Sequence, residues 1–357
     1  MQPAKNKWWI TPLILLTFIV ALHLIALQPA WIEQFYSAHF YPVISSLLRI
    51  LTRWIPFSIG DILYALACVW FIVKSIQFFS RKPTWKKFLF AFRNLAVKCL
   101  WAYLIFLLFW GLNYYRFGIG YEMKLYPEMY STEDLRTVTS KLRDELNNNR
   151  RLIDSLHISY VDEKTTAAQA IQLYDSAKKN YSFLTYNYHD VKKMMVGEIG
   201  NFSGFLGYYN PFTGEAQVNT KVPACTIPFT TCHEIGHQLG FASESEASFA
   251  GYLVIKSGNS PVFNYSAYFE LFGYANGELF VRDSTAARQN IKLLDTLVKK
   301  DYADYRKYLK DNQNPIEPYF TKLYGNYLKA HNQPKGIDSY DEVVAWAIAY
   351  YKKYGKV

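Results

Sequence analysis

His233-Glu234-Ile235-Gly236-His237 is the stretch that decides how the second half of this chain folds and what it binds. Two histidines four positions apart lie on the same face of an α-helix, so both imidazoles can bind one metal ion. Zinc prefers such nitrogen ligands, and a glutamate between them can hold the water that the metal activates. We therefore predict His233 and His237 as zinc ligands and Glu234 as the general base of a hydrolytic reaction.

The third protein ligand is expected shortly after this helix. Ser243 stands where a third histidine would complete the pattern His-Glu-x-x-His-x-x-Gly-x-x-His, which leaves Glu244 and Glu246 as the nearby acids. Ser243 and Glu246 have capping-box spacing, which gives Glu246 a structural role at a helix start. Glu244-x-x-Ala247-Ser248 resembles the second helix of zinc peptidases with a glutamate ligand, in which an Asp or Asn supports a ligand where Ser248 stands here. Glu244 is the predicted ligand, and Glu246 stays open as the alternative.

The residues around the motif predict a mainly helical domain with one short β-hairpin. Gly240 suits the end of the metal-motif helix. Asn210-Pro211-Phe212-Thr213-Gly214 is typical of a turn between two strands. Ser339-Tyr340-Asp341-Glu342 has the pattern of a capping box that opens a last helix, to about residue 353. The other predicted helices cover residues 131–155, 165–179 and 228–239 and a run after Ser243, and the strands cover 205–209 and 215–220.

Two further elements of a peptidase site are weaker in the sequence. The strand at residues 215–220 is either an edge along which an extended peptide pairs or simply one half of a hairpin. An oxyanion also needs a hydrogen-bond donor, and Tyr252, His331 and Tyr340 are candidates. The chain has 30 tyrosines, so composition does not choose among them.

Three apolar segments are each close to the ~20 residues that a membrane-spanning helix needs. They cover about residues 8–27, 62–79 and 95–112. Lys74 and Lys98 lie near the ends of the second and third segments, where they can reach the headgroup region. A cleaved signal peptide is disfavoured, because no small-x-small site follows Leu27 and two more segments come after it. We expect a membrane half, residues 1–116, and a globular half, residues 117–357.

The net charge of +10 belongs almost entirely to the membrane half. Residues 1–114 hold 11 Lys and Arg against Glu33 and Asp61, which gives +9, and the rest hold 28 against 27 acids, which gives +1. This distribution predicts no nucleic-acid partner. Cations in the amino-terminal tail, Lys5 and Lys7, and between residues 81 and 93 place both of these segments in the cytoplasm by the positive-inside rule. The globular half is then extracytoplasmic, which is periplasmic for an inner-membrane protein.

Two smaller features leave alternatives open. Val43 to Trp54 has the pattern of an amphipathic helix, which lies at the outer membrane–water boundary or packs against the spanning helices. Cys225 and Cys232 flank the approach to the metal motif. They form a disulfide in an oxidising compartment, or they are two buried thiols.

Five stretches of the sequence carry a family resemblance: Pro56-Phe57-Ser58-Ile59-Gly60-Asp61, Trp110-Gly111-Leu112-Asn113-Tyr114-Tyr115-Arg116, Pro228-Phe229-Thr230-Thr231-Cys232-His233-Glu234, Gly240-Phe241-Ala242 and Glu244-Ser245-Glu246-Ala247. On these stretches the chain resembles a bacterial family of polytopic membrane proteins that is catalogued only as a domain of unknown function and carries a His-Glu-x-x-His motif. The resemblance implies a zinc peptidase with a glutamate third ligand, fused to membrane helices, and it supplies no substrate. The wider resemblance to such peptidases covers only residues 228 to about 253.

The predicted fold class is three N-terminal transmembrane α-helices followed by a mainly α (α+β), zincin-like extracytoplasmic domain with a short β-hairpin. The predicted function is a zinc-dependent endopeptidase, anchored in the bacterial inner membrane, that hydrolyses envelope proteins or peptides. Its predicted partners are a peptide substrate and the lipid bilayer. The alternative is a non-catalytic envelope scaffold or receptor whose structural zinc is closed by four ligands, for example by both Glu244 and Glu246.

Overall fold

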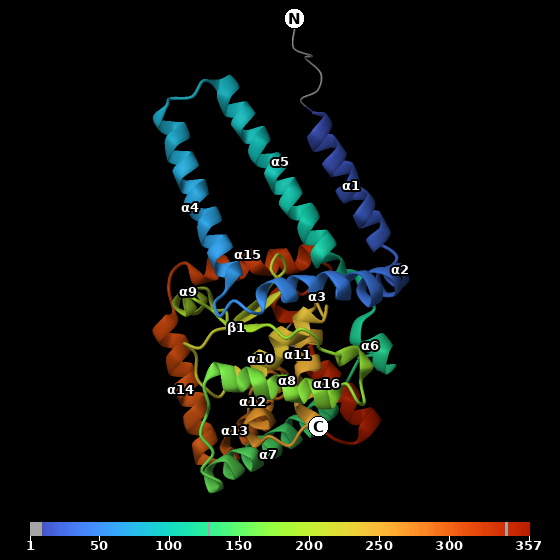
Figure 1. Cartoon of the computed structure of the whole chain (residues 1–357). Coiled ribbons are helices and arrows are strands. Elements are labelled where there is room, and N and C mark those ends of the chain that lie inside the picture. Colours follow the sequence, from blue (N-terminus) through green and yellow to red (C-terminus); the bar gives the residue numbers. More distant parts are fainter. Residues whose placement is uncertain (1–8, 128, 340–341) are drawn as a thin grey trace, which may run out of the picture.

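The computed structural model describes residues 9–127, 129–339 and 342–357, and it consists mainly of helices. Three long helices project from a globular body: α1 (Ile10–Ala26), α4 (Ile59–Ser80) and α5 (Trp85–Phe109) (Figure 1). Helices α4 and α5 are long and apolar enough to span a membrane. A third candidate span arises if α1 and the segment Pro29–Thr52 form one span bent by 97°. The three predicted segments therefore correspond to helices, of which two, or up to three, are candidate spans. Of the residues invoked for the first segment and its tail, Lys5, Lys7 and Trp8 lie outside the described part of the chain.

A bent segment connects α1 to α4 along the surface of the globular body. It consists of α2 (Pro29–Trp31), the π-helix η1 (Ile32–Phe40) and α3 (Tyr41–Thr52). The polar side of α3 is turned inward, with Tyr41, Ser45, Arg49 and Thr52 buried, whereas its apolar Val43, Leu47 and Leu51 are more than half exposed. The apolar side of α3 is therefore open in this structure, and its predicted place, at a membrane–water boundary or against the spanning helices, stays a prediction.

The globular half is built from helices close to those predicted. Helix α7 begins after Ser131, close to the predicted start, and Ser131 and Asp134 form a capping box that the sequence analysis did not predict. The capping box predicted at residues 339–342 is wrong as the start of the last helix, because that helix begins at Val343 and the Ser339 hydroxyl donates to the Gly336 carbonyl at 2.5 Å. Tyr340 and Asp341 lie outside the described residues. The elements are η2 (Gly111–Tyr115), α6 (Gly118–Met123), α7 (Thr132–Ser155), α8 (Glu163–Ala177), η3 (Ser182–Leu184), α9 (Gly197–Ser203), α10 (Ile227–Gln238), α11 (Glu244–Lys256), α12 (Pro261–Arg282), α13 (Ser284–Lys292), α14 (Thr296–Asn312), α15 (Glu317–Ala330), η4 (Gly336–Ser339) and α16 (Val343–Tyr354).

A small mixed sheet lies beside α10. Its strands are β1 (Val191–Lys193), β2 (Gly207–Asn210) and β3 (Glu215–Val218), in the order β1-β3-β2. The predicted hairpin is confirmed, since β2 and β3 pair antiparallel with Tyr209 opposite Ala216. The prediction that β3 is a free edge is wrong, because β1, which the sequence pattern did not reveal, pairs parallel to its other side. Strand β2 is the edge next to the metal-motif helix.

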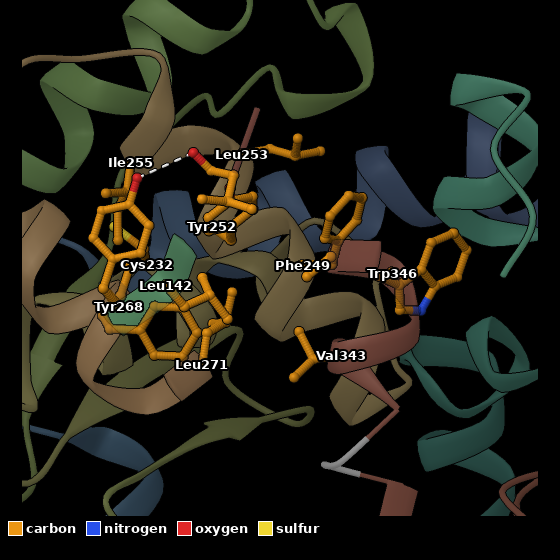
Figure 2. Packing of buried hydrophobic residues seen from close by; sticks show 14 of the residues in the cluster. Leu142, Cys232, Phe249, Tyr252, Leu253, Ile255, Tyr268, Leu271, Val343 and Trp346 are labelled. Carbon is orange, nitrogen blue, oxygen red and sulfur yellow. Dashed lines mark hydrogen bonds between the residues drawn. The ribbon is translucent and has the colours of Figure 1, made fainter. Parts of the chain in front are cut away.

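The hydrophobic core surrounds α10 and α11 with apolar side chains from helices on several sides, α7, α8, α12 and α16 among them. Figure 2 shows part of this cluster, in which Leu142 of α7, Leu271 of α12 and Trp346 of α16 lie around Phe249 and Tyr252 of α11. Because α10 and α11 are enclosed by this packing, the two histidines and the following acid are held on rigid elements rather than on loops.

Candidate metal centre

Helix α10 is buried along its length and lies unusually close to α11. Every residue from Pro228 to Gln238 is buried. A Cβ at Gly236 would lie 3.1 Å from the Ala247 carbonyl oxygen, and a Cβ at Gly251 would lie 3.2 Å from the His233 amide nitrogen. Glycine at these two positions therefore permits the close approach that brings the first turn of α11 to the histidines.

His233, His237 and Glu244 converge on one point. Their ligand atoms all lie within 4.8 Å of one another, and all three side chains are buried. The Glu244 Oε2 atom is 3.2 Å from His233 Nε2 and 3.4 Å from His237 Nε2. No other group of three or more His, Cys, Asp or Glu with this geometry occurs among the described residues. The structure thus brings together the two predicted histidines and the predicted third acid.

The second nitrogen of each imidazole is held by a partner. His237 Nδ1 lies 2.8 Å from the Phe241 carbonyl oxygen, which can only accept, so Nδ1 carries a proton and Nε2 is the nitrogen left to bind a metal. His233 Nδ1 lies 3.0 Å from the Ser248 hydroxyl oxygen. Ser248 therefore takes the position expected of a residue that supports a ligand, with a hydroxyl in place of a carboxylate.

Glu246 has a role different from the predicted one. Its Oε1 accepts a hydrogen bond of 2.9 Å from the Ile119 amide at the start of α6, and the Ser243 hydroxyl bonds to Ser245 instead of capping α11. The capping box predicted at the start of α11 is therefore wrong. Glu246 binds the first turn of a different helix and is not part of the metal group.

Glu234 lies beside a cavity of about 540 Å³ that it lines together with His233 and with residues 205–207. Burial raises the pKa of Glu234 to about 8, and its Oε2 has no hydrogen-bond partner within the described chain. A Cβ at Gly207 would lie 2.7 Å from Glu234 Oε1, so only glycine lets the edge strand β2 approach this carboxylate. A carboxyl whose pKa lies near neutrality is suited to accept and return a proton.

The three candidate oxyanion donors have different outcomes. Tyr252 is fully buried in the core against Phe249 and Tyr350, away from the cavity lining. His331 lies in an aromatic cluster, where its Nδ1 donates to the Tyr327 carbonyl at 2.8 Å. Tyr340 lies outside the described residues.

Tyr324 is a site residue that the sequence analysis missed. It lines the cavity, and its hydroxyl donates to Glu244 Oε1. Phe320, Tyr324, Tyr327 and His331 recur at helical spacing on α15, so one aromatic face was visible in the sequence, but nothing indicated that it meets α11.

The membrane half supplies the cap of the metal-motif helix, which the sequence analysis also missed. The last carbonyls of an α-helix have no partner within the helix. Here the Trp110 indole N–H donates to the His237 carbonyl at 3.2 Å, and the Tyr41 and Ser45 hydroxyls donate to the Gln238 carbonyl at 2.9 and 3.0 Å. Arg49 also reaches the Gln238 carbonyl, at 3.3 Å. Side chains from α3 and the end of α5 thus fix the end of the helix that carries His237.

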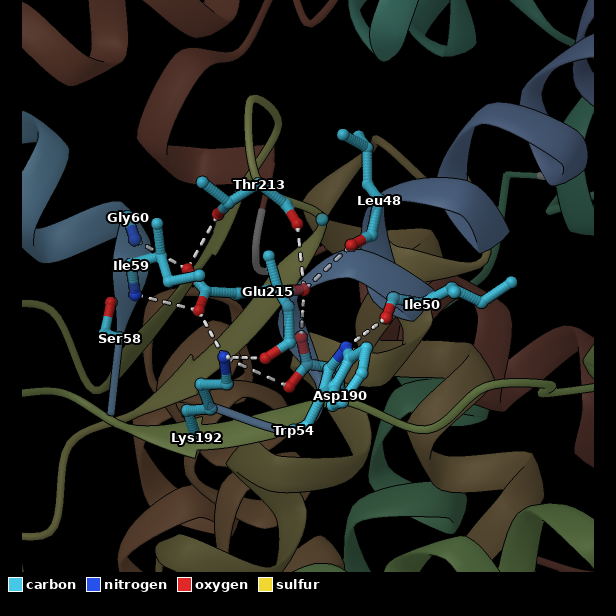
Figure 3. Close-up of polar contacts among 12 residues, drawn as sticks. Leu48, Ile50, Trp54, Ser58, Ile59, Gly60, Asp190, Lys192, Thr213 and Glu215 are labelled. Carbon is cyan, nitrogen blue, oxygen red and sulfur yellow. Dashed lines mark hydrogen bonds and ion pairs between the residues drawn. The ribbon is translucent and has the colours of Figure 1, made fainter. Parts of the chain in front are cut away.

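A second polar connection joins the sheet to helix α4 (Figure 3). The Glu215 carboxylate of β3 accepts hydrogen bonds from the Ile59 and Gly60 amides at 2.9 and 2.6 Å, at the start of α4. It also forms a buried ion pair with Lys192 at 2.6 Å, and Lys192 lies 3.5 Å from Asp190. The carboxylate is stabilised both by the lysine and by the positive end of the helix.

Cys225 and Cys232 are two buried free thiols, so the second of the two alternatives holds in this structure.

Fold and site together define a mainly helical protein with two or three candidate membrane helices and a buried His-His-Glu group that could bind a metal ion. The chain belongs to the family described as Protein of unknown function (DUF3810), whose family model matches residues 36–348. The match begins in η1 and ends in α16, so it includes helices α4 and α5 and the metal group and leaves out α1. No curated protein and no solved structure matches the chain.

Proposed function

We propose that this protein is a membrane-anchored zinc endopeptidase. The observation that carries the proposal is the convergence of His233 Nε2, His237 Nε2 and Glu244 Oε2, next to Glu234 and a cavity. The donor set of two imidazoles and one carboxylate is the one that catalytic zinc uses when it keeps a position open for water.

The residues fit a bound cation. Glu244 Oε2 is buried with no hydrogen-bond partner in the described chain, and His233 Nε2 and His237 Nε2 lie 3.2 and 3.4 Å from it. With protons on the Nδ1 atoms alone, the two Nε2 lone pairs and the carboxylate would face one point and bind a cation there. When bound, zinc would act as a Lewis acid that lowers the pKa of water toward ~7 and polarises the scissile carbonyl.

Glu234 moves the proton in the proposed reaction. It accepts a proton from the water that attacks the carbonyl carbon, and it returns this proton to the amine as the C–N bond breaks. Strand β2 gives an extended peptide a free edge to pair with beside Glu234. The peptide therefore lies between the edge strand and α10, with its scissile bond at the metal group.

The location of this activity is part of the proposal. The distribution of cations places the globular half outside the cytoplasmic membrane of a bacterium, where envelope proteins or peptides are the substrates. A cysteine introduced at the exposed Lys300, in a chain otherwise free of cysteine, should react with a membrane-impermeant maleimide in intact spheroplasts. Reaction only after lysis would contradict the orientation.

The activity is tested on the full chain, purified in detergent with zinc, against a peptide library. Wild type should hydrolyse peptides, and Glu234→Gln should lose at least about 10³-fold in rate while keeping its zinc. Glu133→Gln, at an exposed glutamate of α7, is the matched control and should keep full activity. Undiminished hydrolysis by Glu234→Gln would refute the mechanism.

The scaffold alternative loses its main support in this structure. It was to be favoured by a metal position closed by both Glu244 and Glu246, whereas Glu246 accepts its hydrogen bond from the Ile119 amide. We therefore retain the peptidase as the single proposed function.

A further inference from the structure

The cavity beside the metal group is strongly biased in charge. Its lining includes four acids, Glu234, Glu270, Glu317 and Asp338, and within the described part of the chain it includes no lysine or arginine. The whole chain has 39 Lys and Arg against 29 Asp and Glu, so composition does not account for this bias. A cavity lined by acids and by no basic side chain of the described chain favours cationic ligands, because a bound cation also stabilises the ionised form of these carboxyls.

Glu270 is the acid that structural packing does not explain. It lies on α12, and its Oε1 is buried without a hydrogen-bond partner among the described residues. None of the ion pairs of the described chain includes Glu270, and burial raises its pKa to about 7. It is also not part of the metal group. Glu270 as a whole is partly buried, and a carboxylate oxygen that is buried without a partner destabilises a fold.

Other buried carboxylates of this protein show what a structural role requires. Glu215 receives two amide hydrogen bonds, a lysine and the Thr213 hydroxyl. Glu33 binds Arg116 and the Gly118 amide. Glu270 is partly buried on the wall of the cavity, and within the described chain it has none of these partners. Its missing partner is therefore expected to come from the ligand.

The surroundings of Glu270 suit a long basic side chain. Tyr274 of α12 and Tyr305 and Tyr308 of α14 line the same cavity. Aromatic faces attract ammonium and guanidinium groups and pack against the aliphatic stem of lysine or arginine. The cavity volume of about 540 Å³ lies in the range of ligand sites and accommodates such a side chain together with peptide backbone.

We infer that the cavity selects peptides with a lysine or arginine close to the scissile bond, and that Glu270 pairs with the cationic group. This inference rests on the proposed peptidase function for its cleavage step, but the recognition of the basic side chain does not depend on hydrolysis. Glu270 is then a specificity-determining residue, and it takes no part in metal binding or proton transfer.

The cleavage arm of the test uses the full chain in detergent with zinc. A peptide library is digested and the cleavage sites are identified by mass spectrometry. Matched peptides are then compared that carry Lys, Arg, norleucine or Glu at the position where the library shows a preference. Wild type should prefer Lys or Arg over norleucine by at least about 10²-fold in kcat/KM. Glu270→Gln should lose this preference through a lower kcat/KM for the Lys and Arg peptides, and its zinc content should stay at the wild-type level. Glu317→Gln, at an acid of α15 that lines the same cavity, is the matched control and should keep most of the preference.

The binding arm separates failure of the inference from failure of the proposed function. The affinities of fluorescently labelled Lys and norleucine peptides are measured for the Glu234→Gln variant and for the double variant Glu234→Gln, Glu270→Gln. If the double variant does not fold, Glu270→Asp takes the place of Glu270→Gln. A preference for the Lys peptide of at least about tenfold that depends on Glu270 supports the inference, even if wild type hydrolyses nothing. Hydrolysis or binding without a preference for basic peptides, or a preference that survives Glu270→Gln, overturns the inference and leaves the peptidase proposal standing.

Discussion

At the scale of single residues, the orientation of the two imidazoles depends on one side chain and one carbonyl. Phe241 supplies the carbonyl for His237, which no side-chain substitution removes, whereas Ser248 supplies the hydroxyl for His233. The contribution of this second contact can therefore be measured directly.

Ser248→Ala should weaken zinc binding by about 10–100-fold, because the freed His233 ring loses the partner that fixes its tautomer and direction. Competition with a chelator of known affinity measures the change. Ser257→Ala is the matched control, since the Ser257 hydroxyl donates to the Leu253 carbonyl at the far end of the same helix. Equal zinc affinities for Ser248→Ala and wild type would show that this contact does not orient a ligand.

Glu270 should make the stability of the protein depend on pH. Burial raises its pKa from the usual 4.5 to about 7, so between these pH values the folded state binds more protons than the unfolded state. Wild-type stability therefore falls as pH rises through this window, by up to about 3 kcal/mol for this group. Glu270→Gln should match wild type near pH 4.5 and unfold at a higher temperature near pH 8. A lower unfolding temperature of Glu270→Gln at pH 8 would mean that the carboxylate stabilises the fold.

At the scale of elements, the edge strand β2 and helix α10 meet at Gly207. A methyl group at this position would lie 2.7 Å from both Glu234 Oε1 and the Gln217 carbonyl oxygen. The strand must therefore move away or the carboxylate must turn.

Gly207→Ala should lower peptide hydrolysis by at least about tenfold while zinc content stays at the wild-type level, because a shift of about 1 Å at the catalytic group is enough to reduce the rate strongly. Gly277→Ala is the control, since a Cβ at this helical position meets nothing within 4 Å. The role assigned to β2 would be contradicted by a Gly207→Ala variant with full activity.

How far the sequence predicts these elements depends on the range of the interactions. The helix pair α10 and α11 and the choice of Glu244 were predictable, because spacing within some twenty residues determines which side chains share a face. The pairing of β1 with β3 and the contact of Tyr324 with Glu244 join segments far apart in sequence, and no periodic pattern encodes them. Glu246 is a further case in which local spacing does not reveal a distant partner. Its spacing from Ser243 suggested a cap on its own helix, whereas it accepts a hydrogen bond from the Ile119 amide.

At the scale of the whole molecule, the membrane half and the globular half are joined by buried polar contacts. Trp110 and Tyr41 hold the end of α10, and Glu215 holds the start of α4. Arg116 forms a buried ion pair with Glu33 at 2.6 Å. The predicted boundary near residue 116 stays a prediction, but residues on its amino-terminal side form buried hydrogen bonds with the globular half.

A chain truncated to residues 117–357 should therefore bind zinc at least about tenfold more weakly than the full chain, since several hydrogen bonds of about 1 kcal/mol each are lost at the end of the metal-motif helix. Zinc titration and thermal unfolding of the two proteins measure the difference. In the full chain, Tyr41→Phe should lower stability by about 1 kcal/mol. Equal zinc affinity and stability for the truncated and full chains would show that the two halves are independent.

The central claim is that His233, His237 and Glu244 bind one zinc ion and that Glu234 does not. Measuring metal per chain in the full-length protein, purified in detergent and equilibrated with a zinc buffer, tests it most directly. The account predicts about one zinc per chain in wild type and in Glu234→Gln, and a loss of bound zinc in His237→Ala and Glu244→Ala. A wild-type protein that is folded and free of zinc, or a His237→Ala variant that retains a full equivalent, would contradict it.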